Sequence, residues 1–418
     1  MKYVIGLSIL ILASLASANN LEFLIHESHG NTAEVKQLES DIIHHYNTGN
    51  ITAALAASST ILETLTIDSI GVVAPMNKHG VLHMYNNDLR LSEKTLKRAI
   101  EIAQQLRGIY TIHAVIPLHT LGEIYIKFAE YDLGMDALRE AQHILQRKDG
   151  VKGISQGSVV ASISKLQFLS GNKDGAIVSQ IFYLMVFEEN IGKDNEEFTD
   201  HLDYVATNLL AMNRGDMSEI LYYRYIAIVE KHHGEDSILL IYPLQRLAYV
   251  SKTSIYRNVK KAIGDYDRIV HILNTDPNTN YSDLVTAKVT RADMQYLAGK
   301  KKEAILSYIE AWKEIEEDKF REELFGQPTL LFPETRKMFK VTKHVRVDEE
   351  VALSITATYN IDKTGKINKV KIADSNIGKE DTRMFKHWIE SSKFRPRISN
   401  GKAVSTEGLS YTQSFINR

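Results

Sequence analysis

The sequence predicts a mainly α-helical protein in which helix pairs repeat along the chain and a small α+β domain follows them. Two observations predict this. Glycines recur every 42 residues behind amphipathic helical segments, and the hydrophobic pattern changes from the helical to the strand period beyond residue 350. We expect the helical repeats to cover residues 35–325, a linker to cover residues 326–345, and the α+β domain to cover residues 346–418.

The repeat is clearest in residues that share one 42-residue register. Each register glycine ends an amphipathic segment such as AIEIAQQLRG, and glycine readily adopts the left-handed backbone of a helix C-cap. One helix pair cannot bury its apolar face alone, so a period of this length indicates pairs that stack on one another. The glycines are Gly108, Gly150, Gly192 and Gly234; small residues recur at Gly80, Gly122, Ser164, Ala206 and Ala248, and apolar residues at Ile102, Ile144, Val186, Ile228 and Val270.

Within one period the pattern is two helices around a tight turn, as in LGEIYIKFAEYDLGMDALREA from Leu121 to Ala141. This segment resembles the tetratricopeptide repeat, whose first helix carries L-G-x-x-Y. The string MSEILYYRYIAIVEKHHGED is similar to the 42-residue variant of kinesin light chains. The resemblance implies about six helix pairs in an α-α superhelix, with a groove that binds peptides or extended protein segments.

Two further expectations concern single repeats. The helical spacing of the aromatic residues predicts that they belong to the core, among them Tyr125, Tyr222, Tyr223 and Tyr225. The repeat that begins near Glu235 departs from the pattern, because Lys260 and Asp267 stand where small and aromatic residues are expected. Shifted helices or irregular packing are therefore expected there.

The last part of the chain alternates in the manner of strands. A strand from Val351 to Tyr359 leads through the turn Asp362–Gly365 into a second strand. A short helix capped by Asp381 follows, and a last strand ends at Phe415. The helix is expected to present Met384, Phe385, Trp388 and Ile389 on one face, and the order strand, strand, helix, strand predicts a small sheet covered by one helix.

Three stretches of this part resemble the C-terminal domain of TonB: DKTGKINKVKI (362–372), SKFRPRISNGKAV (392–404) and SYTQSF (410–415). The resemblance implies a periplasmic module that pairs with the short N-terminal peptide of outer-membrane receptors by strand addition. Arg395 and Pro396 match the family motif and are expected to fix the turn into the last strand. The partner-binding edge is expected at Ser410, Tyr411, Thr412, Gln413, Ser414 and Phe415.

The first eighteen residues have the pattern of a signal peptide. Lys2 precedes an apolar run from Val4 to Leu15, and Ala16-Ser17-Ala18 offers a cleavage site. The run is shorter than the ~20 residues that span a bilayer. We expect cleavage after Ala18, a flexible mature segment at residues 19–34, and a location in the periplasm of a Gram-negative bacterium without stable membrane insertion. Because energy-transducing TonB proteins carry a membrane anchor and a Pro-rich spacer, the expected role is that of an accessory to TonB-dependent transport, or a docking module.

Composition and motifs favour a binding protein over an enzyme. A net charge of −2 argues against a dedicated nucleic-acid binder, although residues 339–418 hold 15 Lys+Arg against 9 Asp+Glu and the rest holds 35 against 43. The chain contains no cysteine, no nucleotide-binding or hydrolase string, and no metal-binding histidine spacing in His26–His29, His44–His45 or His232–His233. We therefore expect no catalytic site, cofactor or metal ion, and a protein or peptide partner.

Two alternatives remain open at this stage. One is a structural envelope protein that forms a homodimer or larger homo-oligomer through the edge strand of the C-terminal domain. The other is an enzyme whose site assembles from dispersed residues in the repeat groove, since sites can be built on any fold.

Overall fold

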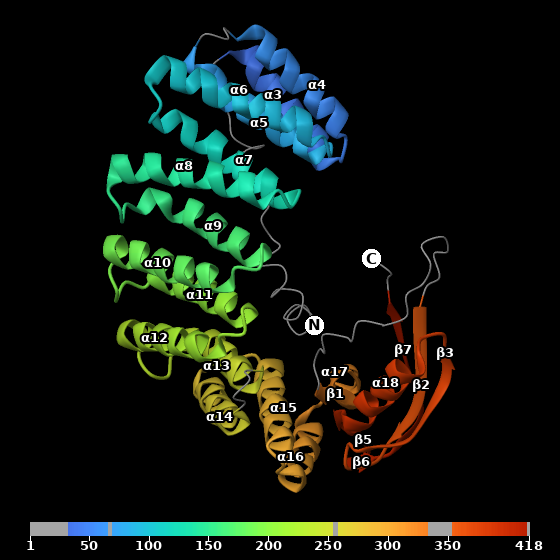
Figure 1. Cartoon of the computed structure of the whole chain (residues 1–418). Coiled ribbons are helices and arrows are strands. Elements are labelled where there is room, and N and C mark those ends of the chain that lie inside the picture. The colour runs from blue at the N-terminus through green and yellow to red at the C-terminus, as the bar shows by residue number, and fades with distance from the viewer. Residues whose placement is uncertain (1–31, 66–68, 254–257, 333–352, 416–418) are drawn as a thin grey trace. The chain divides into compact units, whose positions relative to one another are not determined.

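The computed structural model describes residues 32–65, 69–253, 258–332 and 353–415. The expected signal peptide and nearly all of the expected flexible segment at residues 19–34 lie outside these ranges. The chain forms two compact units, residues 1–228 and 229–418, which we describe separately. The fold class is the predicted one: TPR-like helix pairs, followed by a small region of antiparallel strands (Figure 1).

The helices from α3 to α16 form seven successive pairs, one more than the sequence predicted. Helices pack within each pair, as α5 does on α6 and α7 on α8, and neighbouring pairs pack through α6 on α7 and α8 on α9 (Figure 1). The pairs of the first unit are α3 Ala33–Asn47 and α4 Ile51–Thr64, α5 Val73–Tyr85 and α6 Leu89–Arg107, α7 Val115–Lys127 and α8 Tyr131–Asp149, α9 Gly157–Leu169 and α10 Lys173–Ile191, and α11 Phe198–Ala211 with α12 Gly215–His233, which extends into the second unit.

The second unit continues with two further helix pairs and a short helix: α13 Ile241–Thr253 and α14 Val259–Thr275, α15 Tyr281–Leu297 and α16 Lys301–Glu314, and α17 Asp318–Phe325. Short 3₁₀ turns precede α5, α7, α9 and α13. Among the described residues, no helix has the length and hydropathy needed to cross a bilayer.

The register glycines end helices as predicted. Gly108, Gly150, Gly192 and Gly234 have φ of 88°, 83°, 98° and 86°, a region that side chains disfavour. Each donates its N–H to the carbonyl four residues earlier, as Gly108 does to Gln104 at 2.8 Å. The cap therefore satisfies an otherwise free carbonyl at the same point of each repeat.

The small residues of the register allow the two helices of a pair to approach each other. A Cβ atom at Gly122 on α7 would lie 2.5 Å from Cγ of Leu138 on α8, and one at Gly80 would lie 2.8 Å from Cγ of Leu96. Leu138 and Leu96 are fully buried, so neither side chain has free space to retreat into. The missing side chain at Gly122 thus permits the close approach of α7 and α8.

The sixth pair is irregular in the way the sequence suggested. The second helices of the preceding pairs begin at residues 89, 131, 173 and 215, so a strict period places the next start at 257, whereas α14 begins at Val259. Ala262 and Ile269, each 0% exposed, therefore take the core places that a strict period assigns to Lys260 and Asp267. Two extra residues before α14 move its whole apolar face by two positions.

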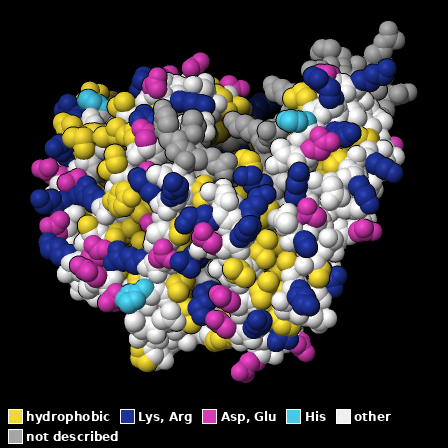
Figure 2. Space-filling view, turned by 90° about the horizontal axis from the view of Figure 1, so that it is seen from below, with side chains coloured by type: hydrophobic (Ala, Val, Ile, Leu, Met, Phe, Trp, Pro, Cys, Tyr) yellow, Lys and Arg dark blue, Asp and Glu magenta, His cyan; other side chains and the backbone are white. Residues whose placement is uncertain are grey.

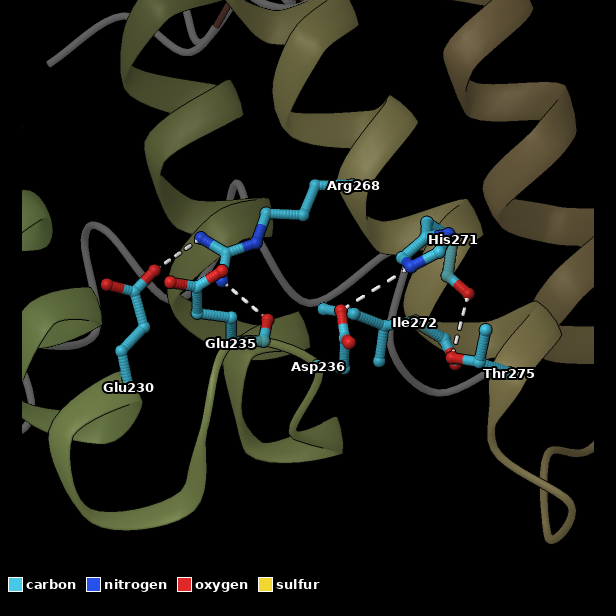
Figure 3. A network of polar contacts seen from close by, with 7 residues as sticks. All are labelled: Glu230, Glu235, Asp236, Arg268, His271, Ile272 and Thr275. Atoms are coloured by element: carbon cyan, nitrogen blue, oxygen red, sulfur yellow. Dashed lines mark hydrogen bonds and ion pairs between the residues drawn. The ribbon is translucent and has the colours of Figure 1, made fainter.

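The polar contacts of α14 show the same displacement. In the fifth pair, Arg224 donates to Glu188 Oε2 at 3.1 Å and to the Lys193 carbonyl at 3.2 Å. In the sixth pair, Arg268 donates to Glu230 Oε1 and to the Glu235 carbonyl, both at 2.6 Å (Figure 3). The residue numbers of the acceptors differ by the regular 42 and those of the two arginines by 44. The same pair of arginine hydrogen bonds is therefore retained on a helix shifted by two residues.

The C-terminal sheet has the predicted strand, strand, helix, strand order. β2 Leu353–Ile361 lies between β3 Ile367–Ser375 and β7 Thr406–Phe415, all antiparallel. α18 Lys379–Ser391 packs on β3 and buries Phe385, Trp388 and Ile389. Two details were wrong: Gly378 is the N-cap, so that Asp381 is buried in the first turn, and Met384 is 44% exposed because its position turns it away from the sheet.

The last helix pair shares a core with the segments that follow it. β1 Thr329–Phe332, within the expected linker, pairs with β4 Lys393–Arg395, and β5 Arg397–Ser399 forms a hairpin with β6 Lys402–Val404. These strands and α17 cover α15 and α16 through one cluster of buried side chains. The cluster includes Tyr296, Tyr308, Phe325, Leu331 and Ile398.

Arg395 holds β4 against α15. Its Nε lies 3.4 Å from Oδ1 of Asp293, and the two side chains are only 9% and 10% exposed. Tyr308 donates its hydroxyl to the same carboxylate at 2.8 Å, and Arg395 Nη1 donates to the Leu324 carbonyl at 3.2 Å. The expectation that Arg395 is structural is confirmed, but it anchors β4 to a helix instead of fixing the turn into the last strand.

The substitution Gly122→Ala is expected to destabilise the first unit by about 1–3 kcal/mol, because the added methyl group overpacks a closed helix contact. The matched substitution Gly264→Ala on α14 meets nothing within 4 Å and should stabilise by roughly 0.5–1 kcal/mol. Urea unfolding of both variants measures the two effects. Equal changes of the same sign would contradict the role assigned to Gly122.

The substitution Arg395→Met is expected to destabilise the second unit by about 3–5 kcal/mol, because it leaves the Asp293 carboxylate buried without its cation. The exposed Arg383, paired with Glu380 at 2.7 Å, supplies the control. Arg383→Met should change the free energy of unfolding by less than about 0.5 kcal/mol. A similar small change in both variants in urea unfolding would show that Arg395 does not anchor β4.

Candidate functional site

The residues predicted to bind a partner lie in β7, at one edge of the sheet. β7 pairs with β2 without interruption from Leu353↔Phe415 to Tyr359↔Leu409. Within residues 32–415 as far as they are described, no other strand pairs with its outer side. In an antiparallel ladder every second residue directs its N–H and C=O away from the paired neighbour. The outer side of β7 therefore presents a regular row of backbone donors and acceptors.

The opposite edge of the sheet, β3, has features that oppose further pairing. Its ladder with β2 shifts register twice, and Lys369 has a φ of 53°. Lys366 precedes the strand and Lys369 and Lys371 lie in it, whereas Glu407 is the one charged residue within β7. Bulges and lysines are the usual protection of an edge strand against unwanted pairing. The two edges are thus unequal, and β7 is the unprotected one.

The side chains of β7 differ between its two faces. Ser410, Thr412 and Ser414 lie opposite Thr358, Thr356 and Ser354 of β2, and the Thr356 and Thr412 hydroxyl oxygens are 2.9 Å apart. On the other face the Tyr411 ring packs on α18, with its centroid 5.4 Å from that of Trp388. Burial against this helix raises the pKa of Tyr411. The packing of Tyr411 on α18 therefore holds β7 in register. The opposite face of the strand, at Ser410, Thr412 and Ser414, carries only neutral hydroxyl groups.

A second arrangement links the first helices of successive pairs in the first unit. Lys165 on α9 donates to Glu123 Oε2 on α7 at 2.9 Å, with side chains 17% and 3% exposed. One turn away, His119 Nε2 lies 2.8 Å from the Ser162 hydroxyl. We call these four residues, with Tyr204 of α11, the inner polar row. The one signal for it in the sequence is that Glu123 and Lys165 carry opposite charges at one register position of adjacent repeats.

Three buried oxygens in and beside the inner polar row lack a donor among the described residues. Gln180 and Asn208 lie beside the Tyr204 hydroxyl, whose pKa is raised chiefly by burial. The remaining oxygens Glu123 Oε1, Gln180 Oε1 and Asn208 Oδ1 are buried and accept no hydrogen bond from the residues that the structure describes. Buried acceptors of this kind are usually satisfied by a donor group. A buried water molecule would satisfy these oxygens, since they have almost no exposed surface.

The aromatic residues predicted to be core residues are divided. Tyr125 and Tyr222 are 2% and 0% exposed, as predicted, and Tyr225 is partly buried. The prediction was wrong for Tyr223, which is 47% exposed. Neighbouring residues on a helix point about 100° apart, so Tyr222 and Tyr223 cannot share one buried face.

The charges on the molecular surface are mixed. On the face seen in Figure 2, Lys and Arg side chains are interspersed with Asp and Glu side chains. The adjacent pair His44–His45 has ring centroids 5.6 Å apart, and His232–His233 6.4 Å apart. His26 and His29 lie outside the described residues.

The chain is similar to known proteins at the level of solved structures only. No family model and no curated protein matches the sequence. Similar solved structures include the TPR-like repeats of a kinesin light chain from Podosopora anserina (13% identity, TM-score 0.40, 48% of this chain and 99% of that one). BtubC from P. vanneervenii matches at 15% identity and TM-score 0.36, covering 62% and 98%, and apo RapI at 13% and 0.39, covering 67% and 98%. At such identities the likeness concerns the fold alone.

Stability is expected to fall as the pH drops below 7, in part because of His119. Burial lowers the pKa of His119 from its ordinary 6.5; nearby Lys165 lowers it further and Glu123 opposes the shift, while Ser162 faces the ring. The unfolded chain binds a proton at this residue below pH 6.5 and the folded chain resists it, so the free energy of unfolding decreases with acidification. His119→Gln should flatten this dependence in urea unfolding between about pH 7.5 and 5.5, the range that spans an ordinary histidine pKa.

The exposed His113 lies in the same region of the chain and supplies the control. His113→Gln should leave the pH dependence of the wild type unchanged. If both variants behave like the wild type, the buried His119 does not contribute to the acid sensitivity.

Proposed function

We propose that this chain is a non-enzymatic scaffold of the periplasm that holds other polypeptides, and that its C-terminal sheet receives an extended segment by strand addition at β7. The observation that carries the proposal is the inequality of the two sheet edges. The β3 ladder shifts register twice and β3 is rich in lysine, whereas β7 pairs with β2 in unbroken register from Leu409 to Phe415 and carries a single charge. An unprotected regular edge is costly to keep unless a partner uses it.

The chemistry of strand addition agrees with this edge. Main-chain hydrogen bonds supply affinity and alternate side chains supply specificity. Tyr411, packed on α18, holds β7 in place before binding, which lowers the ordering cost of association. A partner strand would lie beside the hydroxyl groups of Ser410, Thr412 and Ser414, a surface suited to short polar or β-branched side chains.

The resemblance to TonB suggests the class of partner. In that family the domain pairs with the N-terminal peptide of outer-membrane receptors, and this chain repeats three of its sequence landmarks in order. We therefore assign it an accessory role in TonB-dependent transport. The helical repeats would hold a second polypeptide along the inner polar row, where the Lys165 side chain remains 17% exposed.

The test introduces charge into the edge strand. Ser410→Lys together with Ser414→Lys should weaken binding of synthetic receptor N-terminal peptides at least about tenfold, because a solvated ammonium group opposes pairing at an edge. Ser354 lies opposite Ser414 on the same face but in the central strand β2, so Ser354→Lys should bind normally. Peptide titration followed by fluorescence anisotropy measures both.

Three outcomes would count against the proposal. Equal loss in Ser354→Lys would place the contact on the sheet face instead of the edge. Unchanged binding in the Ser410→Lys, Ser414→Lys variant would remove β7 from the contact. A wild type that binds none of the peptides would remove the transport role.

A structural homo-oligomer is the second candidate, favoured by the residue order in β7. Ser410-Tyr411-Thr412-Gln413-Ser414 is nearly symmetric about Thr412. Two copies could pair antiparallel with Thr412 opposite Thr412 and Ser410 opposite Ser414. Light scattering would then show a dimer. Receptor peptides would not dissociate this dimer, whereas Ser410→Lys together with Ser414→Lys would.

A further inference from the structure

Two histidines on α5 bring their Nε2 atoms into direct contact. His79 and His83 are one turn apart, their Nε2 atoms are separated by 3.1 Å, and their ring planes meet at 82°. On its other side, His79 places Nδ1 3.1 Å from the hydroxyl oxygen of Ser58 on α4. The group therefore joins the first two helix pairs at a contact between neighbouring repeats.

The repeat register shows that this polar group is out of place. The positions equivalent to His79 in the next four pairs carry buried aliphatic residues, and those equivalent to Ser58 are aliphatic in three of four pairs, with Gln142 as the exception. Exchanging aliphatic for polar side chains on both sides of a contact sacrifices hydrophobic burial. Departures of this kind from a local pattern tend to mark functional sites. The aliphatic equivalents are Leu121, Ile163, Val205 and Leu247 for His79, and Ile100, Leu184 and Ile226 for Ser58.

The separation of the two Nε2 atoms fits a shared metal ion. Two imidazole nitrogens bound at 2.0–2.1 Å lie about 3.3 Å apart on a tetrahedral ion and about 2.9 Å apart at right angles on a tetragonal one. The observed 3.1 Å lies between these values. We propose that His79 and His83 chelate a divalent transition-metal ion of the Cu²⁺ or Zn²⁺ class through their Nε2 atoms.

The surroundings orient one of the two rings, that of His79, while Nδ1 of His83 has no hydrogen-bond partner among the described residues. With Nε2 of His79 on the metal, its Nδ1–H donates to Ser58, the outer contact that orients metal-binding imidazoles. Both rings are kept neutral because burial lowers both pKa values, that of His79 to about 4. The carboxylate of Asp88 raises the pKa of His83, which opposes the effect of burial. Its negative charge also favours a cation nearby.

The site has two protein ligands. Among the described residues no cluster of three or more His, Asp or Glu side chains is arranged to hold a metal ion. Water or a donor group of a bound partner would complete the coordination. The ion should thus be exchangeable and bound more weakly than in a closed structural site with four protein ligands.

The experiment uses the full chain, purified without a histidine tag and stripped with EDTA. Calorimetric titration with CuCl₂ and with ZnCl₂ should show uptake of one equivalent of at least one ion, and the same ion should raise the melting temperature. His79→Leu restores the residue type of the repeat register. It should remain folded, with a melting temperature no lower than that of the wild type, and lose both effects. The separate variant His83→Gln, which keeps His79, should also lose the metal uptake.

Two further variants separate this site from other metal-binding groups. His26→Gln with His29→Gln removes the histidines nearest to the N-terminus and should leave the uptake unchanged. Ser58→Ala should keep the stoichiometry but weaken binding about tenfold or more, the usual cost of losing an outer-shell partner. The proposal is overturned if the wild type takes up neither ion, if His79→Leu and His83→Gln bind like the wild type, or if the His26, His29 variant abolishes the uptake.

Discussion

Each helix pair leaves an apolar face that only the next pair can bury, and this constraint governs most of the structure. It explains why small residues such as Gly122 recur where two helices approach and why Gly108 and its equivalents end the second helices. It also explains the sixth pair, where two extra residues shift α14. Ala262 and Ile269 then replace Lys260 and Asp267 in the core, and Arg268 repeats the contacts of Arg224. Burial of the apolar face prevails over the strict sequence period.

The same constraint applies to the last pair, which no further repeat covers. Here α17, β1 and β5 cover the side of α15 and α16 that a further helix pair would otherwise bury. The end of the repeats and the start of the α+β part therefore form one core. A buried ion pair between Arg395 and Asp293 fixes this arrangement. Such a pair adds little net stability compared with a hydrophobic contact, but it tolerates few alternative geometries. The α+β part thereby serves as the cap that a repeat array requires, while no described strand pairs with the outer side of β7.

The candidate sites lie where the repeating pattern is broken or where a regular structure ends. Glu123 and Lys165 form an ion pair at a register position where Val81, Thr207 and Tyr249 are neutral, and His79 replaces a buried aliphatic residue. β7 is the last strand of a sheet and has no covering element on its outer side among the described residues. These features cost stability or solubility, which is the physical reason to assign functions to them and not to the regular core.

The sequence by itself determined the helix pairs, their 42-residue register, the irregular sixth pair and the order of strands and helix in the C-terminal part, because local periodicity and glycine conformations specify them. It also indicated β7 as a strand. Only the tertiary structure decided which edge of the sheet is unprotected, because bulges and pairing depend on strands far apart in sequence. It alone brought Arg395 to Asp293, Lys165 to Glu123 and Ser58 to His79. Contacts between side chains on different helices depend on how the helices pack, and single-residue patterns do not encode that packing.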